Sequence, residues 1–134
     1  MRKYQNFIKR GKIEPLEKIP FHKKAPIRRL TMLSKSIIPK SNTHVAVHFV
    51  DTSKKLPQYS QMHKHDSDEI NLILSYDSKL TYKVRLNDET YKVTSPSTIF
   101  IPKGLHHSAQ AVSGKGIFVC IILSSKYSSK GKSK

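Results

Sequence analysis

Apolar and polar residues alternate along much of the chain between residues 44 and 123, in short segments separated by turn residues. Leu80, Tyr82, Val84 and Leu86, for example, alternate with polar side chains. Successive side chains of a β-strand point to opposite faces of a sheet, so this period indicates strands with one buried face. The last segment is apolar on both faces, which is typical of a strand in the middle of a packed sheet. The expected strands span residues 45–50, 58–65, 69–74, 80–86, 89–93, 98–101 and 116–123.

These short strands and their regular turns predict an all-β fold, an antiparallel double-sheet jelly-roll barrel. No segment shows the period of a helix, and no segment repeats another. A length of 134 residues fits one domain with a core of its own. We place this barrel at residues 41–125.

The two ends of the chain differ from the barrel in composition. Residues 1–40 are basic and contain Pro15, Pro20, Pro26 and Pro39, too many for a long helix. We expect them to form an arm of short extended pieces that lies along a surface, such as that of a partner subunit in a homodimer. Residues 126–134 are mostly Ser, Lys and Gly, which predicts a flexible basic tail.

The net charge of +16 does not by itself indicate a nucleic-acid-binding protein. Residues 1–40 hold twelve Lys or Arg against two Glu, whereas residues 41–125 hold nine against seven acidic residues. The excess charge therefore lies in the ends, and these lack the interleaved aromatic residues of a stacking surface. We expect no nucleic-acid partner. The single Cys120 excludes an internal disulfide, and no apolar run is long enough to span a membrane, so we expect a cytoplasmic protein.

The segment from Gln61 to Glu69 carries the most informative chemistry. His63 and His65 are two residues apart and share one face of an extended strand, so their imidazoles can converge. Glu69 follows four residues later. Imidazole and carboxylate groups together are the ligand set of mid-series transition metals. An exposed sheet surface is the alternative explanation for this pattern.

A second segment delivers another histidine through a rigid corner. Proline fixes one backbone angle and glycine permits a left-handed one, so Pro102 and Gly104 favour a tight turn before His107. The two segments, His-x-His-x-x-x-Glu and then Pro-x-Gly-x-x-His with a pair of strands between them, resemble the two motifs of the cupin superfamily. The resemblance covers about residues 44–123. It implies a barrel in which His63, His65, Glu69 and His107 bind one divalent metal ion.

Several other residues fall in phase with the expected ligands. Tyr59 and His44 are our candidates for a catalytic general base. Gln61 and Asn71 are candidates for binding substrate or for orienting an imidazole through its second nitrogen. The alternative for these four residues is ordinary, hydrogen-bonded filling of the barrel.

The resemblance implies a mononuclear metal-dependent enzyme that acts on a small polar or anionic molecule. Dioxygenases, isomerases, epimerases and lyases all occur among small cupins, so the fold does not select the reaction. Oxygen chemistry would favour Fe(II), and Mn, Ni, Cu or Zn would fit the same ligands. The alternative is a non-catalytic module that binds a metal or a small ligand as a sensor or store.

Overall fold

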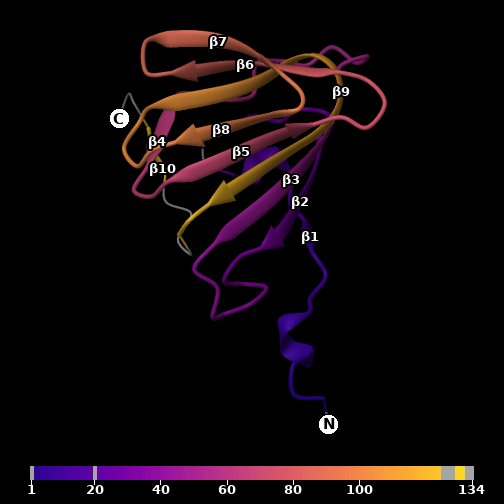
Figure 1. The fold of residues 1–134 in the computed structure, drawn as a ribbon, viewed down its shortest axis with the longest axis vertical. Helices are drawn as coiled ribbons and strands as arrows, with labels where there is room; N and C mark the ends of the chain where they lie inside the picture. The colour runs from indigo at the N-terminus through magenta and orange to yellow at the C-terminus, as the bar shows by residue number, and fades with distance from the viewer. Residues whose placement is uncertain (1, 20, 125–128, 132–134) are drawn as a thin grey trace.

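The chain folds into two antiparallel β-sheets that share one long strand (Figure 1). A computed structural model describes residues 2–19, 21–124 and 129–131. Its elements are η1 Gln5–Phe7, β1 Lys12–Ile13, η2 Leu16–Lys18, β2 Arg28–Leu33, β3 His44–Asp51, β4 His63–His65, β5 Glu69–Leu74, β6 Leu80–Leu86, β7 Glu89–Thr94, β8 Ser97–Ile101, β9 His107–Ile122 and β10 Ser129–Gly131.

The shared strand is β9. Its first half pairs with β6, and its second half lies between β3 and β5. One sheet therefore has the order β1-β2-β3-β9-β5-β8, and the other has β10-β4-β9-β6-β7. Figure 1 shows β9 sweeping across the molecule between these neighbours. This arrangement confirms the prediction of an all-β, antiparallel double-sheet fold.

The hydrophobic core lies between the two sheets. Leu80, Tyr82 and Val84 of β6 are at most 1% exposed, whereas Lys83 and Arg85 point to solvent, as the alternating pattern predicts. Tyr82 stacks on Phe118 of β9 with ring centroids 4.6 Å apart. Such an offset or stacked aromatic pair adds about 0.5–1.5 kcal/mol to the burial of the two rings.

The sheet begins earlier in the chain than the sequence predicted. Strand β2 falls within the expected arm of residues 1–40, but it pairs along its length with β3. Its buried positions are Arg29 and Thr31, which are polar, so its alternation carries no hydrophobic signal. Farther toward the N-terminus, buried Leu16 packs with Ile27 and Tyr59 in a second apolar cluster. The expected boundary at residue 41 is therefore too late.

The other parts of the chain's ends agree with the expectations only in part. Tyr4, Phe7 and Ile8 are exposed, and Figure 1 shows the N-terminal residues extending away from the sheets. Within the expected tail of residues 126–134, Ser129–Gly131 form β10, which pairs with β4. The remaining residues of that tail lie outside the described part of the chain. Among the described residues, no helix has both the length and the apolar character needed to cross a membrane.

Gly104 and Gly114 both have a positive φ, but they differ in the space around them. Gly114 has φ of 93°, and a Cβ there would lie 1.7 Å from the carbonyl oxygen of Lys79, where β9 passes between the sheets. Gly104 has φ of 84°, but nothing lies within 4 Å of its added Cβ. We expect Gly104→Ala to cost about 1–2 kcal/mol of unfolding free energy, the cost of the left-handed conformation alone.

Gly114→Ala adds a steric clash with the backbone and should cost about 2–5 kcal/mol. Urea unfolding of the two variants measures this difference. Equal losses would contradict the clash at Gly114.

Candidate metal centre

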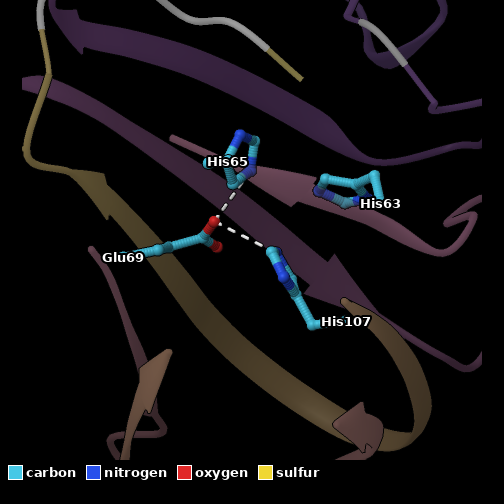
Figure 2. Close-up of side chains that lie close together, drawn as sticks. All are labelled: His63, His65, Glu69 and His107. Carbon is cyan, nitrogen blue, oxygen red and sulfur yellow. Dashed lines mark hydrogen bonds and ion pairs between the residues drawn. The ribbon is translucent and has the colours of Figure 1, made fainter. Parts of the chain in front are cut away.

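Four buried side chains from three strands converge inside the barrel. His63 and His65 come from β4, Glu69 begins β5, and His107 begins β9. One ligand atom from each of the four lies within 4.8 Å of the others. His63 and His107 are direct partners across the β4–β9 pairing. Figure 2 shows the Glu69 carboxylate between the rings of His65 and His107, with His63 beside them.

The corner before His107 is fastened to the loop that carries the other ligands. The amide of Gly104 donates to the carbonyl of His65 at 2.9 Å, and the amide of Lys103 donates to Oδ1 of Asp68 at 2.8 Å. Asp68 therefore has a positioning role that its place in a turn did not indicate. These two contacts fix the start of β9 relative to β4 and β5.

Two of the histidines are oriented by backbone carbonyls. Nδ1 of His63 donates to the carbonyl of Gln61 at 2.7 Å, and Nδ1 of His107 donates to that of Leu105 at 3.0 Å. A carbonyl oxygen only accepts, so Nδ1 carries the proton in both rings. Nε2 is then the nitrogen available for other contacts, as in metal-binding histidines held by an outer hydrogen bond.

The Glu69 carboxylate is the electrostatic centre of the cluster. Its Oε1 lies 3.0 Å from Nε2 of His65 and 3.1 Å from Nε2 of His107. Its Oε2 accepts from Asn71 Nδ2 at 2.7 Å and from Cys120 Sγ at 3.4 Å. Burial would raise the pKa of Glu69, but the contacts with His107 and His65 outweigh burial and hold it well below its usual value.

The pKa values of His107 and His63 are shifted in opposite directions. Burial lowers the pKa of His107, but the hydrogen bond and the charge of Glu69 overcome this effect and raise it. The pKa of His63 falls to about 3, because burial disfavours its cation and His107 repels it. His63 is therefore neutral at pH 7 and offers a lone pair on Nε2.

This donor set fits a divalent transition-metal ion. Three imidazoles and one ionised carboxylate converge in a site that excludes bulk water, and carbonyls and Asn71 orient three of the four groups. Mid-series metals prefer these nitrogen and oxygen ligands. A metal ion would compete with the proton that joins His107 to Glu69, so binding should release protons and weaken at low pH.

A small cavity of about 30 Å³ adjoins the cluster, enough for about one water molecule. Ile19 and His22, from the segment expected to be an arm, form part of its wall. Phe21 has φ of 62° and stacks on His63 with ring centroids 5.6 Å apart. The lining residues are Ile19, His22, Arg29, His48, Tyr59, Ser60, His63, Glu69, Asn71, Tyr82, His107, Ala109, Phe118 and Cys120.

The other four candidate residues have different surroundings. Tyr59 is buried and lines the cavity, and its hydroxyl accepts from the amide of Ala111 at 3.1 Å. Asn71 lines the cavity too, but its amide donates to Glu69. The Gln61 side chain is exposed, and only its carbonyl reaches the site, through His63. His44 is buried beside Arg29 and is not among the residues that line the cavity.

Sequence reasoning missed two basic residues that line the cavity. Arg29 and His22 lie in the segment assigned to the arm, where the basic composition concealed inward-facing positions. His48, on the buried face of β3, also lines the cavity. The inward face of β2 at Arg29 and Thr31 is polar, so hydrophobic alternation gave no signal that could have placed this strand in the barrel.

The fold is that of the cupins. A cupin-2 domain protein from Rhodospirillum rubrum matches 100% of this chain and 80% of its own, with a TM-score of 0.61 and 13% identity. The polyketide cyclase RemF from Streptomyces resistomycificus matches 94% of this chain and 80% of its own, with a TM-score of 0.61 and 15% identity. A conserved protein of unknown function from Streptococcus pyogenes matches 89% of this chain and 92% of its own, at 20% identity and a TM-score of 0.57.

No protein-family model matches the sequence, and no curated protein matches it. The likeness therefore lies in the fold. It confirms the resemblance to cupins and the jelly-roll prediction, and the cluster of three histidines and one glutamate lies within that fold.

Adjacent histidines provide a matched test of the candidate metal site. His107 belongs to the cluster, whereas the neighbouring His106 does not. Loss of a hydrogen-bond partner outside the ligand set costs roughly 10- to 100-fold in metal affinity. We expect His107→Gln to cost more, because it removes a ligand. His106→Gln should retain stoichiometric metal. Metal analysis after loading with Fe(II), Mn(II), Ni(II) or Zn(II) measures both, and equal metal content in the two variants would contradict this site.

The buried His48 makes stability depend on pH. Its pKa falls from 6.5 to about 3, because burial disfavours the imidazolium and Arg29 repels it. The unfolded chain binds this proton below pH 6.5 and the folded chain does not, so the contribution to stability is complete above pH 6.5 and is lost as pH falls toward 3.

We expect His48→Gln to reduce the slope of unfolding free energy against pH by about 1.4 kcal/mol per pH unit. This reduction corresponds to close to one proton fewer taken up on unfolding. Urea unfolding of metal-free protein between pH 4.5 and pH 6, compared with the parent protein, measures the slope. An unchanged slope would show that His48 is not held neutral.

Proposed function

We propose that this protein is a mononuclear metal-dependent enzyme with a cupin fold, and that it acts on a small polar or anionic molecule. The observation that carries the proposal is the buried cluster of His63, His65, Glu69 and His107 beside an interior cavity. A site that only stabilised the fold would need no adjoining space. Polyketide cyclase RemF, one of the similar structures, is named as an enzyme, which supports a catalytic role for this kind of barrel.

In this proposal the four clustered residues hold the metal, which would supply Lewis-acid or oxygen-binding chemistry to a substrate in the cavity. Asn71 holds the carboxylate of Glu69 in place through Oε2. The carbonyls of Gln61 and Leu105 keep the proton of each histidine on Nδ1. Tyr59 lines the cavity as a neutral phenol, because burial raises its pKa, so it can donate a hydrogen bond there.

The reaction class stays open between a dioxygenase, an isomerase or epimerase, and a lyase. Fe(II) is our preferred metal for oxygen chemistry, and Mn, Ni or Zn would suit isomerisation or elimination; Cu would fit the same ligands. A second candidate function is a non-catalytic sensor or storage module. The small cavity of about 30 Å³, closed in part by Ile19 and His22, favours this alternative because it leaves little room for turnover without movement.

The two functions are separated by loading the full chain with each metal and adding small carboxylic acids, diketones and thiols. Oxygen consumption detects a dioxygenase, and proton NMR of the mixtures detects isomerisation or elimination. We expect turnover with at least one metal, and its loss in His107→Gln but not in His106→Gln. Stoichiometric metal and ligand binding without conversion of any compound would favour the sensor. Failure to bind any metal would overturn the enzyme and the metal-binding sensor alike.

Two further expectations stay predictions. The exposed side chains of Tyr4, Phe7 and Ile8 support a homodimer in which the first residues contact a second copy. A cytoplasmic location is the second of these expectations, and it rests on the sequence alone.

A further inference from the structure

A buried arginine lies in the same cavity as the clustered ligands. Arg29 of β2 is 3% exposed and lines the cavity together with Glu69 and His107. Its Nη1 donates to Thr31 Oγ1 at 2.8 Å, and its Nη2 donates to His44 Nε2 at 3.4 Å. Arginine is rarely buried to this degree unless its charge is paired, because removing a cation from water is costly.

The contacts of Arg29 hold its guanidinium in a fixed place. The His44 ring accepts from it, which requires an unprotonated Nε2, and the pKa of His44 is lowered to about 4 by burial and then by Arg29. Thr31 and His44 belong to the adjacent strands β2 and β3, which pair through Thr31 and Ala46. The cation is therefore held by the sheet itself and not by a mobile loop.

The charges around the cavity sum to an excess of positive charge once a metal is present. Glu69 is an anion and Arg29 is a cation, while His48 is neutral at pH 7 because its pKa lies near 3. A divalent ion held by the cluster would add two positive charges. In a site shielded from water, this field strongly favours an anionic ligand.

Among small anions, the planar guanidinium of Arg29 favours those with two oxygens in one plane. A guanidinium presents paired N–H donors in a planar fork, which matches the two oxygens of a carboxylate. We infer that Arg29 forms a carboxylate-binding subsite inside the barrel, and that the substrate class is a small carboxylic acid held between Arg29 and the metal site. This inference rests on the proposed function and makes its substrate class specific.

The ligand must displace part of the wall. The cavity now has room for about one water molecule, so an acid of four or more heavy atoms enters only when Ile19 and His22 move. Both residues line the cavity, whereas Arg29 lies on β2, which pairs along its length with β3.

The neighbouring Arg28 provides a matched control, because it lies on the same strand and is exposed. The test compares the parent protein, Arg29→Met and Arg28→Met, each as the full chain loaded with Zn(II) and checked for metal content. Isothermal titration calorimetry with acetate, oxalate and malonate, and with neutral malonamide, measures binding without any requirement for turnover.

We expect Arg29→Met to weaken binding of at least one carboxylate by about 10- to 100-fold, the range for a hydrogen bond to a charged group. Malonamide should change by less than about threefold, and Arg28→Met should match the parent protein. Carboxylate affinities equal in Arg29→Met and the parent protein, or no binding of any carboxylate to the parent protein, would overturn the inference.

If Arg29→Met does not fold, Arg29→Lys replaces it in the test, because this variant keeps the positive charge. We expect it to retain metal and to bind the same carboxylate about 3- to 10-fold more weakly, because a lysine lacks the fork. Equal affinity would overturn the subsite. If the metal-loaded protein converts neutral compounds but binds no carboxylate, the proposed function stands and this inference is wrong. Failure to bind metal would instead remove the proposed function, and malonate titration of the metal-free protein would still test Arg29.

Discussion

The buried carboxylate of Glu69, held between the imidazoles of His65 and His107, is the interaction on which the rest of the structure depends. Oε1 lies within 3.1 Å of Nε2 in both rings. Moving an ion of this kind out of water costs several kcal/mol unless well-placed partners compensate. Three strands must therefore meet at one point, and an error of about one ångström in any of them would leave a charge without compensation.

The long strand β9 makes this meeting possible. His107 stands at its start, and its far end pairs with β3 and with β5, the strand that begins with Glu69. A single strand thus fixes the separation between one ligand and the sheet that carries another. The link from Gly104 to the carbonyl of His65 fastens the same corner to β4. Backbone hydrogen bonds shared among these strands therefore hold the site in place.

The sequence was informative where chemistry and local geometry coincide. His63 and His65 share a strand face by simple alternation, and Pro102 and Gly104 mark a corner in any context. Alternation also located the buried face of β6. It could not locate β2, because the inward residues there are Arg29 and Thr31, and a polar inward face leaves no hydrophobic period. The exposed side chain of Gln61 shows the other limit, since alternation assigns a face but not the backbone carbonyl that orients His63.

The part of the site that alternation missed is the part that bears on specificity. Metal ligands define which chemistry is available, and that set is common to proteins with different substrates. Under the proposed function, discrimination between substrates would come from the other residues that line the cavity, among them Arg29, His48 and His22. Two of these three come from residues before the first strand that hydrophobic periodicity identifies. A basic segment that resembles a solvated arm by composition therefore supplies both a buried cation and part of the cover. A basic segment at the end of a chain should therefore not be assigned to solvent on its charge alone. Every second residue of such a segment can point into a polar interior when the segment forms a strand.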